Sequence, residues 1–279
     1  GSFSALVAGS GPPIVCLHGF PDNRHTFKYQ LPVLVRAGYR VVVPVMRGYE
    51  PGSVQKDNKY FVRNLAEDVL SWMDELEMPE AHVLGHDWGG ITAWAVAALA
   101  PDRVMSATTI AMPYMRNFYK GLLKVPLQLA YSWYAHFFQV RLFSDLWLSQ
   151  DNYKAVDQLW RRWSPDWDIP EGILEGVKKT LGQPGVKSAA LAYYRCFYDR
   201  FSDEGRTSNK LLSTVIEVPA MAIAGGKDGC IHKRLFDTLM NKRYFKEGLN
   251  YNCIDDAGHF VHLEKPDEVN TLLLDFFAT

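Results

Sequence analysis

Short runs rich in β-branched residues alternate with helical patterns in the first 112 residues, and this alternation constrains the fold more than any other feature. The runs fall at residues 13–17, 40–43, 81–85 and 104–110. We expect the last three to be strands buried on both faces. Between them, residues 61–76 and 88–99 carry helical patterns. Alternation of this βαβ kind predicts a parallel sheet covered by helices.

The alternation stops after residue 112 and resumes after residue 214. Residues 113–214 contain no strand run of useful length, but they hold five of the eight tryptophans and eight of the fourteen tyrosines. We then expect a strand at 218–224, a helix at 231–240, a strand at 250–254 and a last helix after Pro266. The sequence thus predicts an α/β core made of residues 1–112 and 215–279, interrupted by a helical cap at 113–214.

Composition limits the class of partner. The 279 residues carry 30 Lys and Arg against 31 Asp and Glu, a net charge of -1, so we expect no basic field for nucleic acid or an anionic membrane. No apolar run approaches the roughly 18 residues of a membrane-spanning helix. The four cysteines at 16, 196, 230 and 253 lack metal-type spacing, which favours reduced, structural thiols in a cytoplasmic protein.

A strand, a tight turn and a helix start follow one another in residues 81–90, which read AHVLGHDWGG. A sharp strand-to-helix turn leaves no space for side chains at the flanking positions and lifts its central residue into a pocket. Glycines four apart occur elsewhere, but only Gly85 and Gly89 join an apolar strand to a helix. The pattern predicts Asp87 as a nucleophile at this turn.

The chemistry expected at this turn is that of a carboxylate. The sequence contains no Gly-x-Ser-x-Gly or Gly-x-Cys-x-Gly, so the nucleophile of a serine or cysteine acyl-transfer enzyme is missing. A helix N-terminus favours an ionised carboxylate through its dipole and free N–H groups. A carboxylate can attack a saturated carbon usefully, because water can later open the ester at the carboxylate's own carbonyl carbon. The alternative interpretation is that Asp87 is a plain helix N-cap.

Opening such an ester requires a base. His259 follows the last expected strand, and Asp228 follows the strand before it. The order Asp87, Asp228, His259 is the nucleophile, acid, base order of the α/β-hydrolase fold. Asp255 and Asp256 are rival acids, but they precede the histidine on its own loop and are more typical of a turn. The histidines considered less suited to the role of base are those at 18, 25, 82, 86, 136, 232 and 262.

An oxyanion hole is expected where the first buried run ends, in residues 18–21, which read HGFP. The backbone N–H groups of Phe20 and Trp88 could together hold the oxyanion formed when water attacks the ester.

These motifs resemble those of the α/β-hydrolase epoxide hydrolases, which carry His-Gly-x-Pro at the oxyanion loop and Gly-x-Asp-Trp-Gly at the nucleophile turn. The resemblance spans essentially the whole chain and implies a mostly parallel sheet flanked by helices, with an inserted helical cap. In this family two cap tyrosines hydrogen-bond the epoxide oxygen. The segments WYAHFFQ at 133–139 and LAYYR at 191–195 resemble the tyrosine segments, which implies this role for Tyr134 and for Tyr194 rather than Tyr193.

The resemblance implies conversion of a small apolar epoxide and water to a vicinal diol, without cofactor or metal. The aromatic cap predicts a fairly large apolar pocket. The first alternative is a haloalkane dehalogenase, which shares the aspartate nucleophile but needs a second halide donor, such as the indole of one of the cap tryptophans at 133, 147, 160, 163 and 167. The second is a binding protein on the same fold that has lost turnover. The sequence leaves open whether the protein forms a homodimer.

Overall fold

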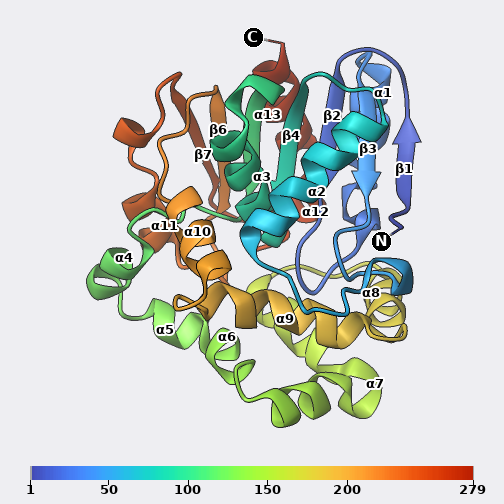
Figure 1. Cartoon of the computed structure of the whole chain (residues 1–279), viewed down its shortest axis with the longest axis vertical. Coiled ribbons are helices and arrows are strands. Elements are labelled where there is room, and N and C mark those ends of the chain that lie inside the picture. The colour runs from blue at the N-terminus through green and yellow to red at the C-terminus, as the bar shows by residue number, and fades with distance from the viewer. Residues whose placement is uncertain (1, 279) are drawn as a thin grey trace.

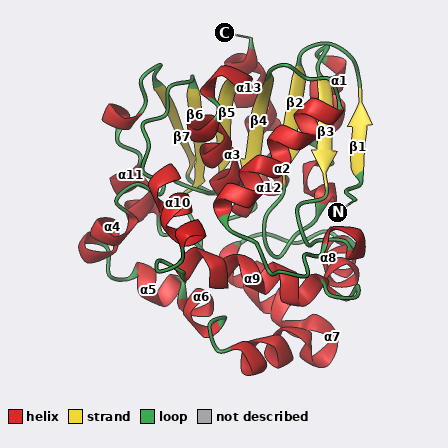
Figure 2. Cartoon of the chain, in the orientation of Figure 1, coloured by secondary structure: helices red, strands yellow, loops and turns green. Residues whose placement is uncertain are grey.

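A seven-stranded sheet forms the centre of the computed structural model, which describes residues 2–278 (Figures 1 and 2). The strand order is β1-β3-β2-β4-β5-β6-β7; β1 pairs antiparallel with β3, and the other neighbours pair in parallel. The strands are β1 (Ala5–Ala8), β2 (Pro13–Leu17), β3 (Arg40–Pro44), β4 (Ala81–His86), β5 (Val104–Ile110), β6 (Ala220–Gly225) and β7 (Leu249–Ile254).

Helices cover both faces of the sheet because alternate strand residues point to opposite sides. Val42 of β3 belongs to the core on the side of α2 and α3, whereas Val41 and Val43 belong to the core on the side of α1 and α13. Figure 1 shows α2 and α3 in front of the sheet. The helices of this α/β part are α1 (Gln30–Arg36), α2 (Val62–Glu75), α3 (Trp88–Leu99), α11 (Lys233–Leu239), α12 (Val261–Glu264) and α13 (Pro266–Phe277), with 3₁₀ turns at Arg24–Phe27, Pro51–Ser53, Pro101–Arg103 and Lys242–Tyr244.

The strands expected from the sequence are all present, with ends within two residues of those predicted. The pattern missed β1, which is an edge strand of only four residues. All four are exposed or partly exposed, Val7 to 48%, so the run is too short to stand out as a buried strand. It also missed α1, which carries Pro32 in its first turn, where proline is tolerated because the N–H there has no helical partner.

Between β5 and β6 the chain forms helices and no strand, as the sequence predicts. These helices lie below the carboxyl ends of the parallel strands in Figure 1. They are α4 (Phe118–Lys124), α5 (Gln128–Tyr131), α6 (Trp133–Phe137), α7 (Arg141–Trp163), α8 (Ile173–Leu181), α9 (Val186–Tyr198) and α10 (Asp203–Leu211). Left-handed residues at 151–153 break α7 into two parts. We call residues 113–214 the cap, and its exact limits stay a prediction.

Within residues 2–278, the helices are too short or too polar for any of them to cross a bilayer.

Candidate active site

Asp87 lies on a strained turn between β4 and α3. Its backbone has φ 52° and ψ -118°, a conformation that is uncommon outside glycine. The flanking glycines are required by space: a Cβ on Gly85 would lie 2.0 Å from the carbonyl oxygen of Gly89, and a Cβ on Gly89 would lie 1.9 Å from that of Leu17. The sequence spacing therefore corresponds to a turn that presses α3 against the ends of β4 and β2.

The two carboxylate oxygens of Asp87 have different surroundings. The backbone N–H of Phe20 donates a hydrogen bond of 2.8 Å to Oδ1, and a Cβ on Gly19 would lie 2.5 Å from the same oxygen. Oδ2 lies 3.6 Å from Nε2 of His259. Asp87 is 2% exposed. One oxygen is thus held by the loop after β2, while the other faces the imidazole.

His259 and Asp228 form a buried pair beside Asp87. Nδ1–H of His259 donates to Oδ2 of Asp228 at 2.9 Å, and Oδ1 of Asp228 accepts from the backbone N–H groups of Cys230 (2.6 Å) and Ile231 (2.9 Å). Burial by itself would lower the pKa of His259, but the charge of Asp228, its hydrogen bond to Nδ1 and the nearby carboxylate of Asp87 raise it well above its usual value. Asp255 and Asp256 are exposed in a turn of the preceding loop.

The other buried histidines are held as neutral rings. Burial lowers the pKa of His18 and of His82 to about 4 and that of His262 to about 3. Burial, with the charges of His262 and His259, also lowers the pKa of His86 well below its usual value. Among the described histidines with a shifted pKa, His259 alone is shifted upward, which separates it from its rivals.

The end of α7 in the cap is bonded to the loops that carry both His259 and Asp228. The carbonyl oxygen of Trp163 accepts from the backbone N–H groups of His259 and Gly229, each at 3.0 Å. Oγ of Ser164 accepts from the N–H of His259 at 3.0 Å and donates to Glu264 at 2.5 Å. Glu264 in turn accepts from the N–H of Gly258 at 2.8 Å. We call this arrangement the Ser164–Glu264 bridge.

Two tyrosine hydroxyls from the cap lie buried at the same cavity as Asp87. Tyr134 OH lies 3.1 Å from Sγ of Cys230, while Tyr194 OH has no hydrogen-bond partner among the described residues. Burial raises the pKa of Tyr134 well above its usual value; burial, with the charge of Asp87, does the same for Tyr194. Both phenols therefore keep their protons at neutral pH and can donate them.

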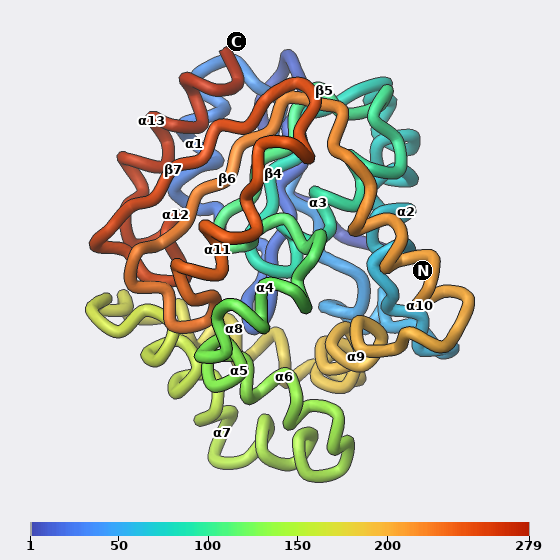
Figure 3. Tube along the Cα trace, turned by 90° about the vertical axis from the view of Figure 1, so that its left-hand side faces the viewer, coloured from blue at the N-terminus to red at the C-terminus, as the bar shows by residue number. Residues whose placement is uncertain are grey.

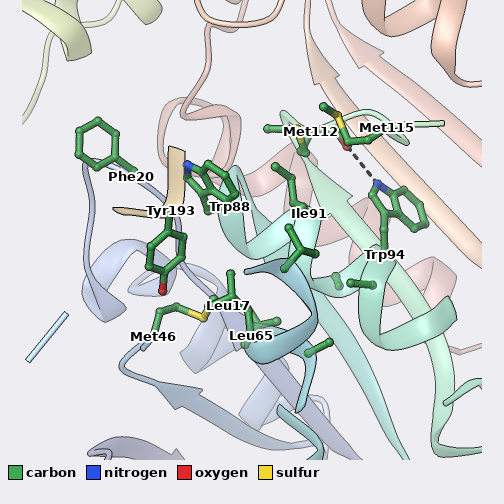
Figure 4. Packing of buried hydrophobic residues seen from close by; sticks show 14 of the residues in the cluster. Leu17, Phe20, Met46, Leu65, Trp88, Ile91, Trp94, Met112, Met115 and Tyr193 are labelled. Atoms are coloured by element: carbon green, nitrogen blue, oxygen red, sulfur yellow. Dashed lines mark hydrogen bonds between the residues drawn. The ribbon is translucent and has the colours of Figure 1, made fainter. Parts of the chain in front are cut away.

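Tyr193 points away from this cavity. Its hydroxyl donates to the carbonyl oxygen of Arg47 at 2.6 Å. Figure 4 shows its ring below Trp88, with the hydroxyl directed toward Met46. The structure thus gives the two neighbouring tyrosines different environments, since Tyr193 packs in the core and Tyr194 faces the cavity.

The cavity is apolar but small. Its volume is about 60 Å³, and Asp87, Trp88, Ile91, Met112, Tyr134 and Tyr194 are among the residues that line it. The expectation of a fairly large pocket is therefore wrong for this structure. The reason is that the cap aromatics pack on each other: the rings of Tyr134 and Tyr194 lie 5.7 Å apart, and that of Tyr194 lies 5.0 Å from both Trp88 and Phe138.

Two buried clusters bring three metal-type ligand atoms within 4.8 Å of one another. They are formed by Asp87, Cys230 and His259, and by Asp22, His86 and His262. The second cluster adjoins His259, because Nε2–H of His86 donates a hydrogen bond to the carbonyl oxygen of His259 at 3.1 Å. The first cluster consists of the predicted nucleophile, the predicted base and Cys230.

Sequence reasoning missed several residues of the site. Cys230 was interpreted as a structural thiol, yet it lies beside Tyr134, and its only sequence signal is its position two residues after Asp228. Ser164 and Glu264 carry no motif at all.

The cap tryptophans now have defined positions. The indole N–H of Trp160 donates to the carbonyl oxygen of Pro21 at 2.8 Å. That of Trp163 is buried without a partner among the described residues, and its ring lies 5.1 Å from the ring of His259 and 5.0 Å from that of Tyr134.

Comparison with known proteins agrees with this fold. A family model described as alpha/beta hydrolase fold matches residues 12–266. Epoxide hydrolase 4 of Homo sapiens is 28% identical over 282 residues, covering 98% of this chain and 75% of that protein. AB hydrolase superfamily protein YfhM of Bacillus subtilis (strain 168) is 28% identical over 267 residues, covering 95% and 90%. An epoxide hydrolase of Bacillus megaterium, solved in complex with an inhibitor, has the same fold, with a TM-score of 0.84, 21% identity and coverage of 99% and 97%.

Proposed function

Because this chain belongs to the alpha/beta hydrolase fold family, we propose that it is an epoxide hydrolase that works through a covalent ester on Asp87. The observation that carries the proposal is the meeting, at one buried cavity, of a carboxylate on a strained turn with the hydroxyls of Tyr134 and Tyr194. The names of its relatives, several of which are epoxide hydrolases, support the same substrate class.

In the first step, Oδ2 of Asp87 attacks an epoxide carbon, and the bond from that carbon to the ring oxygen breaks. The leaving alkoxide needs a proton, which Tyr134 or Tyr194 supplies because burial keeps both phenols protonated. General acid help of this kind contributes typically about 10²- to 10⁴-fold to the rate. The product of this step is a hydroxyalkyl ester of Asp87.

In the second step, water attacks the carbonyl carbon of the ester. His259 takes a proton from this water, and Asp228 holds the imidazole in place through Nδ1. Because Oδ1 of Asp87 already accepts from Phe20 N–H, that N–H, together with the N–H of Trp88, would hold the oxyanion that develops there. The oxyanion collapses and the bond from the carbonyl carbon to the alkoxide oxygen breaks. The alkoxide takes the proton of the new carboxyl group, so the diol leaves and the carboxylate is restored. The imidazolium returns its proton to the tyrosinate through solvent.

The charge of Asp87 couples the two steps. In the free enzyme, the nearby carboxylate of Asp87 is one of the causes that raise the pKa of His259. The ester is neutral, so that contribution disappears when it forms, and His259 becomes neutral more easily when a base is needed.

Trapping the ester tests this scheme. His259→Gln should form the ester and fail to open it, so that mass spectrometry finds the intact mass of a styrene-oxide-like substrate on the peptide that holds Asp87. His25→Gln, a change at a surface histidine, is the matched control and should turn over normally. Full turnover by His259→Gln would remove His259 from the mechanism. In heavy-oxygen water, wild-type enzyme should incorporate label into the Asp87 carboxylate over repeated cycles.

The tyrosines are tested by removing their hydroxyls. Replacing both Tyr134 and Tyr194 by Phe should abolish ring opening and leave binding of an amide inhibitor. Tyr193→Phe, which loses a hydrogen bond to the backbone in the core, should cost about 1 kcal/mol of stability and keep turnover. Near-normal turnover by the double variant would refute the assignment.

A haloalkane dehalogenase is the second candidate. The indole N–H of Trp163, which has no partner within residues 2–278, favours it, because such an enzyme needs a halide donor besides Trp88. Incubation with an epoxide and a bromoalkane separates the two functions by the product: a diol supports the first and bromide the second.

A further inference from the structure

Helices α4 to α7 expose an unusual amount of apolar surface that the chemistry above does not use. Leu123 is 85% exposed, Leu142 69% and Phe143 65%. Its exposed apolar side chains include Leu123, Leu127, Trp133, Leu142, Phe143 and Leu146. We call it the cap face. The helices that carry it run one after another down the side of the molecule that faces the viewer in Figure 3.

The charges on the cap face have one sign. From residue 103 to residue 144 the chain contains no Asp or Glu, while residues 113–144 contain Arg116, Lys120, Lys124 and Arg141. The first acid beyond this segment, Asp145, is bound by the guanidinium of Arg195 at 2.5 Å. The chain is nearly neutral as a whole, so the basic character of this face comes from segregation of charge and not from composition.

A basic hollow adjoins the cap face between α4 and α11. It has a volume of about 170 Å³. Among residues 2–278 its lining has no acid and includes four cationic side chains, those of Arg116, Lys120, Lys124 and Arg243. Two of them are fixed by Tyr244, since the guanidinium carbons of Arg116 and Arg243 lie 4.4 and 4.6 Å from the centre of its ring. A hollow of this kind suits a phosphate or carboxylate group.

The cap face also borders the cavity that holds Asp87. Phe118 of α4 and Ala135 of α6 line this cavity, as does Ser132 between α5 and α6. Phe118 and Ser132 are partly exposed, so the cavity wall reaches the surface at the cap face. Apolar molecules dissolved in a bilayer would meet the cavity there without passing through water.

We propose that the cap face is a docking surface for an anionic phospholipid bilayer. Segments that lie in a membrane interface typically combine exposed Leu, Phe and Trp side chains with basic residues and no acids. The cap face has this composition. The apolar side chains would enter the headgroup region, and the basic hollow would hold a lipid phosphate or carboxylate. A second copy of the chain fits less well, because a two-fold contact between cap faces would bring like charges together.

Vesicle sedimentation tests the proposal with the full chain. The protein should sediment with vesicles of phosphatidylcholine and phosphatidylserine, and much less with phosphatidylcholine alone or at high salt. The triple variant Leu123→Ser, Leu142→Ser, Phe143→Ser should lower the partition coefficient at least about tenfold, because three large apolar side chains leave the interface. Val7→Ser, at an exposed apolar position on the edge strand β1, is the matched control and should bind as wild type does.

A second pair of variants tests the charges. Lys120→Ala and Lys124→Ala should each weaken binding to the anionic vesicles roughly fivefold. Lys56→Ala and Lys179→Ala, at exposed positions away from the cap face, should leave it unchanged. Free glycerophosphoserine should compete only weakly, because it offers no interface for the apolar side chains.

The proposal fails if wild-type protein does not sediment with the anionic vesicles, or if control and cap-face variants lose the same amount of binding. It also fails if free glycerophosphoserine binds as strongly as the vesicles do. If the cap-face variants instead change the oligomeric state in sedimentation velocity and leave vesicle binding intact, the occupant of the face is a second copy of the chain. None of these readouts depends on the epoxide hydrolase activity.

Discussion

A methyl group added at Gly89 tests whether the strained turn determines the position of Asp87. In Gly89→Ala the new Cβ would lie 1.9 Å from the carbonyl oxygen of Leu17, and both atoms belong to rigid elements, α3 and the end of β2. Relieving this clash requires the two elements to separate by about an ångström or more, because overpacking against backbone has no flexible side chain to absorb it. That movement would also break the 2.8 Å hydrogen bond from Phe20 N–H to Asp87.

The expected cost has two parts. Overpacking of this kind costs typically about 1–3 kcal/mol in the free energy of unfolding, and a misplacement of about 1 Å at the reacting atoms costs about 10²-fold in rate. Urea denaturation followed by circular dichroism measures the first, and epoxide turnover measures the second.

Gly176→Ala is the matched control. Gly176 lies inside α8, where the nearest atom to a new Cβ is 3.8 Å away, so this variant should be stabilised by about 0.5–1 kcal/mol and stay active. The reasoning is refuted if the free energy of unfolding of Gly89→Ala lies within about 0.5 kcal/mol of the wild-type value and the variant turns over at the same rate. An ordinary surface substitution changes stability by that much.

Two further predictions concern the surroundings of the site. In Ser164→Ala, His259 loses a hydrogen bond that fixes its backbone, so the second step should slow and the ester should accumulate. Both kcat and KM should then fall together. A fall in kcat at constant KM would contradict a positioning role for Ser164. Burial raises the pKa of Asp22 from 3.8 to about 7, so the folded chain binds its proton more tightly than the unfolded chain, and wild-type stability should fall as pH rises between these values. Asp22→Asn should lack that fall, and urea denaturation at pH 5 and pH 8 checks this; a fall of the same size in the variant would assign the pH dependence to another group.

Local patterns in the sequence were sufficient to predict the core of the fold. The buried strands β3, β4 and β5 fall on the short runs that the sequence marks as strands. The turn at Asp87 is marked by two glycines, at which the neighbouring backbone leaves no space for a Cβ. His259 and Asp228 could be selected because each follows a strand of a parallel sheet, and the carboxyl ends of such strands meet at one edge. The structure places both beside Asp87, and their roles in turnover stay predictions.

Contacts between distant segments were beyond the reach of those patterns. Ser164 and the N–H of His259 are 95 positions apart, and no periodicity relates them. The position of Cys230 beside Tyr134 and the small size of the cavity likewise depend on how the cap packs on the sheet.

The sequence by itself therefore determined the layers of the fold and the turn that presents Asp87, because strand and helix periods and the spacing of glycines at a turn are local properties of a chain. Only the tertiary structure decided what holds His259 to the cap and which basic residues line the hollow, because both depend on how the cap helices pack against the sheet and against each other. A net charge of -1 is compatible with either an even or a segregated distribution of charge over the surface, and folding determines which of the two occurs.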